Sequence, residues 1–369
     1  MGARVTGEGL ENSIVAADVG VAPVEGQVAL AGRVAGEWRQ REGRVRIGSS
    51  YLGTESSRLT VEGVLGEKLT AALFSTNPQD LEPALALLAG RKVRLPVALQ
   101  GGSLKVEAVV AGALEKPEIA GTVLAERARW GDVSVGRAGG RFRISESQFR
   151  VDGLEVVQDG GRLTGRIRLG LAGWQVAEDA EFEAALEARG LRLGDVVRQA
   201  GADFKVEGTA DASLDAAGTL DAPRGTLRWQ GRQVVLGGER FGRLNGRLRA
   251  SSGEAVRIEG DLDVDEAVVA VAAEYLHPRG DWRRGEARIG LKTKGLRLGQ
   301  SEWVREQRVG LDAAVGLDLE AVVGLEREST RLRRLTGVAA VEGLRDGERE
   351  LGAFRVEAKT EGAIMRLGL

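Results

Sequence analysis

One pentapeptide, Gly-Leu-Arg-Leu-Gly, occurs at residues 190–194 and returns unchanged at residues 295–299, 105 residues later. Other landmarks recur in the same order at offsets of 105 to 108: Trp174 as Trp282, Phe149–Gly153 as Val256–Gly260, and Gly112–Pro117 as Gly218–Pro223. Recurrence at a fixed period is the signature of a repeat array. The chain is therefore predicted to consist of repeats of about 105 residues.

The unit boundaries fall inside strand-like sequence, and no linker separates them. We expect a partial unit over 1–90 that ends in a short helix, units over 91–201 and 202–307, and a partial unit over 308–369. Together they would form one continuous elongated domain. Arrays bury their core between neighbouring units and present one long surface, which favours a scaffold or conduit over a pocket.

The dominant local pattern alternates apolar and polar residues with period two, as in a strand with one apolar face. In Arg162–Leu169 the apolar residues Leu163, Ile167 and Leu169 share one side. Val256–Val264 repeats this pattern. The sequence therefore predicts mainly β-strands.

Short turn signals separate these strands, at Gln100–Ser103, Asp159–Gly161 and Ser251–Glu254. Such short connections are typical of hairpins, because parallel pairing needs crossovers of about a dozen residues. We expect antiparallel pairing and about eight strands per unit. Helical signals are few. They predict short helices within residues 77–90, 195–201 and 300–307.

A sheet that is apolar on one face must have that face covered. Few helices are available here, so the sheet must curl on itself. The predicted fold class is all-β: an elongated antiparallel sheet curled into a U-shaped β-groove (a β-taco) of ~105-residue repeats, with a few short helices.

Composition excludes several functions. The chain has 52 basic and 54 acidic residues, and no basic stripe is visible along the sequence, so nucleic acid is not an expected partner. It has no cysteine, which excludes disulfides and thiolate metal sites. Uninterrupted apolar runs are far shorter than the ~20 residues that span a bilayer, and no signal peptide is visible. The chain therefore reads as an excerpt of a longer protein, or as one without its anchors.

No enzyme emerges from the candidate chemistry. His277, the only histidine, lies in a turn signature before Pro278. Asp261, Asp263 and Asp265 could hold calcium, but their spacing of two places them on the polar face of a strand. Tryptophans such as Trp130 and Trp229 are interpreted as packing anchors. We expect no catalytic residue, no cofactor and no metal site.

The apolar face of the predicted strands supplies the candidate binding surface. The residues expected to line it are Leu104, Val106, Phe142, Ile144, Phe149, Val151, Leu163, Ile167, Leu169, Phe182, Leu186, Leu227, Leu244, Leu248, Val256, Ile258, Leu262 and Val264.

Several of these segments resemble the TamB family of AsmA-like cell-envelope proteins. Gly112–Gly121 follows the Gly-x-Leu-x-x-Pro-x-x-x-Gly element common in that family, and Gly218–Leu227 resembles it with a shorter spacing to its last glycine. Ser57–Gly63 followed by Asp80–Leu88 is also similar to that family. The motifs are short, and their order and recurrence carry the resemblance.

The resemblance implies a β-groove with an apolar interior in the periplasm of a diderm bacterium, conducting phospholipid between the inner and outer membranes. It also implies a link to outer-membrane protein assembly with an outer-membrane β-barrel partner, and it brings no catalytic residues. The membrane helix and terminal domain of the family are not visible. Membrane contact is therefore expected through regions outside this chain, with inner-membrane anchoring only if the chain is part of a longer protein.

Two functions stay open at this point. In the first, phospholipid acyl chains lie in the groove. In the second, the chain is a binding and assembly module that holds strands of outer-membrane β-barrel proteins along its sheet edges. A parallel β-helix enzyme or adhesin is a third reading, but its rungs would repeat at roughly 20 to 25 residues instead of 105.

Overall fold

A computed structural model gives the fold of the chain. The structure describes residues 2–6, 14–22, 30–90, 92–95, 97–130, 133–199, 205–236, 239–241, 244–252, 255–264, 267–278, 284–300, 304, 310–326, 329–361 and 364–368. Contacts divide the chain into two compact units, Met1–Ala180 and Glu181–Leu369. Each unit is described by itself.

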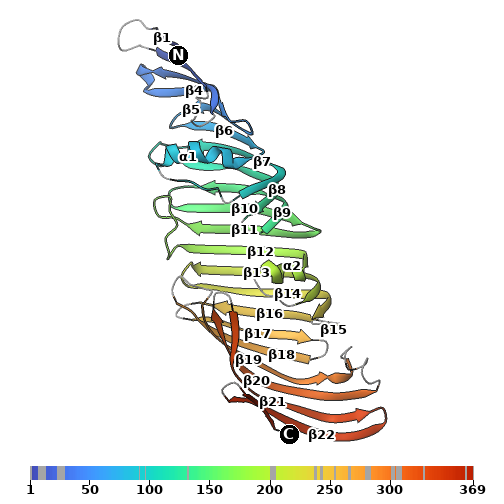
Figure 1. The fold of residues 1–369 in the computed structure, drawn as a ribbon. Helices are drawn as coiled ribbons and strands as arrows, with labels where there is room; N and C mark the ends of the chain where they lie inside the picture. Colours follow the sequence, from blue (N-terminus) through green and yellow to red (C-terminus); the bar gives the residue numbers. More distant parts are fainter. Residues whose placement is uncertain are drawn as a thin grey trace. The chain divides into compact units, whose positions relative to one another are not determined.

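In its described part, unit 1 consists of strands with three short helical segments (Figure 1). Its elements are β1 (Gly2–Thr6), β2 (Ile14–Val21), β3 (Ala31–Arg39), η2 (Gln40–Glu42), β4 (Arg44–Gly53), β5 (Ser57–Val64), β6 (Lys68–Ser75), η3 (Pro78–Leu81), α1 (Glu82–Ala89), β7 (Val97–Ala111), β8 (Glu118–Trp130), β9 (Val133–Ile144), β10 (Gln148–Gln158) and β11 (Gly161–Gly170).

Unit 2 is built in the same way. Its elements are β12 (Glu181–Arg192), α2 (Leu193–Gln199), β13 (Val206–Thr219), β14 (Pro223–Leu236), β15 (Glu239–Phe241), β16 (Leu244–Ser251), β17 (Val256–Val264), β18 (Ala267–Leu276), β19 (Gly285–Arg297), η4 (Leu298–Gln300), β20 (Leu311–Glu326), β21 (Ser329–Asp346), β22 (Arg349–Glu361) and β23 (Ile364–Gly368).

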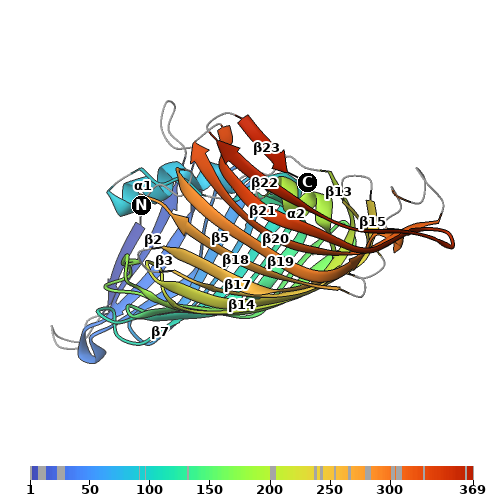
Figure 2. The same ribbon diagram turned by 90° about the horizontal axis from the view of Figure 1, so that it is seen from below.

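Within each unit the strands pair antiparallel in chain order. The short β15 is a side branch, because β14 pairs with both β15 and β16. Among the described pairings of each unit, none joins its first strand to its last, so neither sheet closes. The strands of unit 2 bend along their length (Figure 2). The predicted fold class, an all-β antiparallel sheet curled into an open groove with a few short helices, is confirmed.

The order of elements repeats along the chain. In its described part, six strands precede η3 and α1, six precede α2, and six long strands plus the three-residue β15 precede η4. The expectation of about eight strands per unit was wrong. The strands are longer than the turn signals indicate: Gln100–Ser103, read as a turn, lies inside β7. There Gly101 adopts a positive φ of 70° and the β7–β8 register shifts between Leu99 and Ser103.

β-Bulges explain why the pentapeptide is repeated. The register shifts between Ala188 and Leu191 in β12, and between Thr293 and Leu296 in β19. The first glycine of each pentapeptide lies inside the shift with a positive φ, 64° at Gly190 and 80° at Gly295. Glycine tolerates this conformation, and a bulge bends its strand. Each copy therefore marks a bend just before a helical turn.

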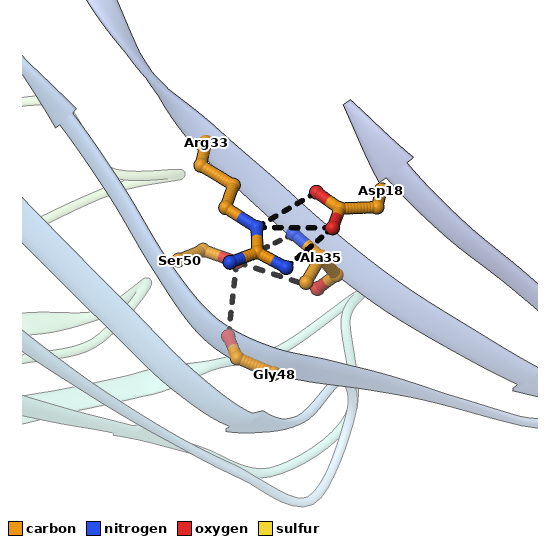
Figure 3. Close-up of polar contacts among 5 residues, drawn as sticks. All are labelled: Asp18, Arg33, Ala35, Gly48 and Ser50. Carbon is orange, nitrogen blue, oxygen red and sulfur yellow. Dashed lines mark hydrogen bonds and ion pairs between the residues drawn. The ribbon is translucent and has the colours of Figure 1, made fainter. Parts of the chain in front are cut away.

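Two bulges in unit 1 are held together by one buried serine (Figure 3). The register of β3 with β4 shifts after Arg33, and that of β4 with β5 shifts before Ser50. The Ser50 hydroxyl accepts a hydrogen bond from the Ala35 backbone N–H at 3.0 Å and lies 2.9 Å from the Gly48 carbonyl, to which it donates. It thus satisfies backbone groups that the bulges remove from the ladder.

The ion pair between Arg33 and Asp18 lies beside Ser50, on the exposed side of β2 and β3. Figure 3 shows the Arg33 guanidinium against the Asp18 carboxylate, with Arg33 Nε 2.8 Å from Asp18 Oδ1. The hydrogen bonds from Arg33 hold the pKa of Asp18 below its usual value. Both side chains are exposed, so this pair adds little to stability.

The matched hairpins share one turn. In each, the glycine has a positive φ, 90° at Gly112 and 126° at Gly218. The backbone N–H four residues after that glycine donates to the carbonyl one residue after it, with N···O distances of 3.0 Å from Lys116 and 3.1 Å from Ala222. The recurrence seen in sequence is thus a recurrence of backbone geometry.

The predicted helix within residues 77–90 is present as η3 followed by α1, and Gly90 ends it with a φ of 63°. Figure 2 shows α1 at one end of the unit 1 strands. The second predicted helix begins two residues early, as α2 at Leu193. Of the third, residues 300–307, the structure describes the end of η4 and Val304, and the rest lies outside the described residues.

A glycine in β16 makes room for the largest side chain on the apolar face of unit 2. A methyl group on Gly246 would lie 2.3 Å from Trp229 Nε1 and 2.8 Å from Leu262 Cδ2. We therefore expect Gly246→Ala to reduce the free energy of unfolding by about 1 to 3 kcal/mol through overpacking. Thermal denaturation measures this. Gly290→Ala is the control, because a methyl there meets only Ala272 O at 3.8 Å. Equal losses in both variants would contradict the packing.

Candidate functional site

The register places the predicted lining residues of unit 1 on one face of its sheet. Phe149 lies opposite Ile144 on one side and Leu169 on the other, and Val151 lies between Phe142 and Ile167. Directly opposed residues share a face. Leu104 and Val106 join the same face through Ala125 and Val123 of β8, and Leu163 joins it through Val156.

Unit 2 shows the same arrangement. A continuous row crosses β12, β13, β14 and β16: Leu186, Leu214, Leu227 and Leu248. The other predicted residues lie on this face at neighbouring positions: Phe182 in β12, Leu244 in β16, and Val256, Ile258, Leu262 and Val264 in β17. Each unit therefore carries one broad apolar face.

Burial shows that no second layer of described residues is packed on this face. In the described part of the chain, every buried hydrophobic residue is alanine or valine. A packed core buries mainly its large aliphatic and aromatic side chains. Here each predicted lining residue is partly exposed, neither buried nor freely exposed. Partial burial is what neighbouring strands give to a face that no further layer covers.

The total surface supports this reading. The accessible surface is 24638 Å², whereas two compact bodies that share the mass of 39.1 kDa would expose roughly 17,000 Å². Within each unit the extensive strand contacts are those between paired strands. The apolar face is therefore left open to a ligand.

The opposite face of each sheet is polar. In β16 and β17, Arg247 lies opposite Asp261 and Arg249 opposite Glu259, while Arg257 Nε is 3.1 Å from Glu274 Oε1. Lys292 Nζ lies 2.7 Å from Asp318 Oδ2, which raises the pKa of Lys292. This face suits solvent and gives the sheet two chemically distinct sides.

Shallow hollows interrupt the polar face. One of about 700 Å³ spans β4 to β8. Its lining includes the small residues Thr60, Ala72 and Thr122 and the charged residues Arg58 and Glu62. Another, of about 790 Å³, spans β17 to β21 between charged side chains. Charged side chains are part of the lining of both hollows, so neither hollow is a continuous apolar surface.

A β-bulge changes which residues of a strand lie on the apolar face, so strict alternation assigns some residues to the wrong face. Strict period two from Val151 would put Gly153 and Glu155 on the apolar face. The register shift after Val151, where Gly153 has a φ of 58°, brings Leu154 and Val156 there instead.

The structure adds residues to the apolar face that the sequence analysis did not select. The added residues are Leu154, Val156, Leu214, Val269, Val271, Ile289, Leu291, Leu317 and Leu319. In β13 the signal was the alternation Ala212, Leu214, Ala216, which small side chains make weak.

The described polar candidates do not come together in one site. His277 stacks on Tyr275 with ring centroids 5.5 Å apart, and its Nδ1 is 3.0 Å from the Pro278 carbonyl oxygen. Asp261 and Asp263 lie on the polar face of β17, and Asp265 lies outside the described residues, as does Trp282. Among the residues that the structure describes, no cluster of three metal-binding side chains occurs. The absence of catalysis and of a metal site stays a prediction.

Trp130, Trp174 and Trp229 occupy different environments. Trp130 is 62% exposed at the end of β8, and Trp174 lies in a turn with a φ of 68°. Trp229 lies on the apolar face, opposite Ala212 and Gly246. The anchor interpretation therefore fits Trp229 best, because its ring packs between strands.

The apolar face of unit 2 contains a buried hydroxyl group, that of Thr293. Thr293, opposite Val269 and Leu317, is buried, and its Oγ1 has no hydrogen-bond partner among the described residues. A buried unsatisfied hydroxyl costs ~1 to 3 kcal/mol. We expect Thr293→Val to raise the free energy of unfolding by about 1 kcal/mol, measured by urea denaturation. A loss of stability would mean that the hydroxyl has a partner.

Comparison with known proteins identifies no relative. No protein-family model matches the chain, and no curated protein or solved structure is significantly similar to it. Among the described helices, none is both long and apolar enough to cross a membrane. The resemblance to the TamB family therefore stays a hypothesis from short motifs.

Proposed function

We propose that the chain is a segment of a bridge-like lipid conduit, which conducts phospholipid between the inner and outer membranes of a diderm bacterium. The observation that supports it best is the open apolar face of each unit, on which every predicted lining residue is partly exposed. Exposed apolar patches beyond a few hundred Å² are rare on soluble proteins and mark binding sites. The location in the periplasm is part of this proposal.

The energetics favour acyl chains as the ligand. Burying each CH₂ is worth about 0.8 kcal/mol, so one acyl chain gains on the order of 10 kcal/mol. The rows of leucine, isoleucine and valine change little from strand to strand, as in the row Leu186, Leu214, Leu227 and Leu248. Because the gain varies little with position, a chain could slide along the face. Headgroups would project through the open side, and no covalent step is needed.

The second candidate function is a binding and assembly module that holds unfolded strands of outer-membrane proteins. In this function the backbone of a client strand pairs with an edge strand of the sheet, and the apolar face is not the binding surface. In the part of the chain that the structure describes, the most distinctive surface is the apolar face, which favours lipid.

Extraction and mass spectrometry of the purified chain separate the two functions. The conduit requires phospholipid to co-purify in amounts comparable to the protein, and delipidation to lower the thermal midpoint. Binding stabilises the folded state in proportion to occupancy. Protein free of acyl ligand that still captures strand peptides would contradict the conduit and support the assembly module.

A further inference from the structure

The polar face of unit 1 contains a row of like charges. Arg150 of β10 lies directly opposite Arg143 of β9 and directly opposite Arg168 of β11. Like charges in directly opposed positions destabilise a sheet. The expectation from the sequence that no basic stripe exists is therefore wrong for this face, because the register assembles one from three strands.

The row belongs to a wider basic surface on three consecutive strands. Strands β9 to β11 contain seven arginines and two acidic residues. The arginines, all exposed, are Arg137, Arg141, Arg143, Arg150, Arg162, Arg166 and Arg168. The acidic residues are Asp152 and Glu155, and Glu118 and Glu126 of β8 lie beside Arg143 and Arg137. The whole chain has a net charge of −2, so this surface, here called the arginine face, is a local excess.

Nearby carboxylates compensate only part of this charge. Arg143 Nε lies 2.9 Å from Glu118 Oε1, and Arg150 Nε lies 2.7 Å from Asp152 Oδ2. In unit 2, by contrast, Arg247, Arg249 and Arg257 each have a carboxylate directly opposite on the next strand. In β9 to β11 this cross-strand compensation is only partial. Arg162 forms an ion pair with Glu155 at 2.8 Å and Arg141 lies opposite Asp152, but the row of Arg143, Arg150 and Arg168 places arginine opposite arginine.

We propose that the arginine face docks on an anionic phospholipid surface. A guanidinium binds phosphate oxygens bidentately, and arginine is more weakly hydrated than lysine, which suits a headgroup layer. The arginines lie on an open sheet face, with strands ~4.8 Å apart, so the matching ligand is a surface of many anions. This contact lies on the face opposite the apolar one and would hold even if the groove carried no lipid.

Vesicle co-sedimentation of the full chain tests the proposal. Vesicles of phosphatidylcholine with a minority of phosphatidylglycerol should bind the chain, and vesicles of phosphatidylcholine alone should not. Raising the salt to about 1 M should release it, because the Debye length falls to ~3 Å.

A matched pair of triple variants locates the contact. In Arg143→Gln/Arg150→Gln/Arg166→Gln the affinity should fall about 100-fold, at roughly a factor of five for each arginine near the surface. Arg247→Gln/Arg249→Gln/Arg257→Gln removes the same charge from unit 2 and should change the affinity less than about threefold. The first triple should keep the wild-type thermal midpoint, since it relieves like-charge contacts.

Several results would overturn the proposal: equal losses in both triples, no binding of the wild type to anionic vesicles, or a short DNA duplex bound in a salt-dependent way while vesicles are not. Release by millimolar inorganic phosphate would indicate a single-anion site and also overturn it. Ile167→Asp should bind anionic vesicles normally, so a failed groove and a failed arginine face are distinguishable.

Discussion

Replacing Ile167 by Asp, or Ile258 by Asp, is expected to slow phospholipid transfer between vesicles at least about tenfold. Ile167 lies opposite Val151, and Ile258 lies between Ala250 and Ala273, all on the apolar faces. Burying an unpaired carboxylate among acyl chains costs several kcal/mol. Transfer of a fluorescent phospholipid from donor to acceptor vesicles measures the effect.

Two substitutions to Asp on the polar face serve as controls. Thr122 lies between Glu107 and Arg141, so an Asp there faces one charge of each sign, and Ser251 lies between Arg224 and Arg257. Thr122→Asp and Ser251→Asp should therefore transfer lipid at the wild-type rate. Arg257 itself is unsuitable, because an Asp there would face Glu274.

The pH dependence of the groove variants gives a second readout. Burial raises the pKa of an introduced carboxyl group, so Asp at 167 should become neutral at mildly acidic pH. Transfer by Ile167→Asp should then recover partly as the pH falls, while the wild-type rate does not rise. A variant that transfers lipid normally at neutral pH would mean that acyl chains do not touch this face.

Removing the Asp80 carboxylate should be the most destabilising polar substitution. Asp80 in η3 accepts hydrogen bonds from the hydroxyls of Thr54, Ser56 and Ser57, at 2.5, 2.5 and 2.7 Å. The Ser57 hydroxyl also bonds the buried Ser75 hydroxyl at 2.8 Å. This cluster fastens the helical segment to the start of β5. We expect Asp80→Ala to reduce the free energy of unfolding by about 3 kcal/mol, because several donors lose their acceptor.

The sign of the pH dependence follows from the same cluster. Burial raises the pKa of Asp80, but the hydroxyl hydrogen bonds outweigh it and hold the pKa below the usual 3.8. The ionised carboxylate therefore stabilises the fold above pH 3.8, and this stabilisation is lost as the pH falls through the lower folded-state value.

Urea denaturation between neutral and acidic pH checks this dependence. Wild-type stability should fall below pH ~4, and Asp80→Asn should flatten that fall. Asp159→Asn is the control, because Asp159 is exposed in the β10–β11 turn. An equal response of the two variants would contradict a special role for Asp80.

Strand identity and face were predictable from the sequence because they depend on local alternation. Val256–Val264 is the full extent of β17, and its apolar residues all lie on one face. The helix that ends at Gly90 was readable from its apolar spacing and its terminal glycine. Such features need only nearest neighbours in the chain.

Features that depend on how the strands pair could not be predicted from the sequence. The shift at Val151 and the glycine pair inside β7 change which side chains share a face. The glycine pair was interpreted as a turn, and the shift at Val151 was not predicted. The arginine row likewise depends on the register of three strands. Arg143, Arg150 and Arg168 are well separated in the sequence, so they do not appear there as a run of basic residues. The sequence shows that the pentapeptide is repeated, but it does not show that each copy forms a β-bulge.

Site-specific photo-crosslinking tests the central claim most directly. A neutral photoreactive amino acid is placed at 167 or 258 on the apolar faces, and at 164 or 257 on the polar faces, where Thr164 lies opposite Glu155 and Arg257 opposite Glu274. Mass spectrometry of the irradiated protein should find phospholipid adducts at 167 and 258, and none at 164 and 257. Equal labelling of both faces, or no labelling of either, would contradict a lipid-filled groove.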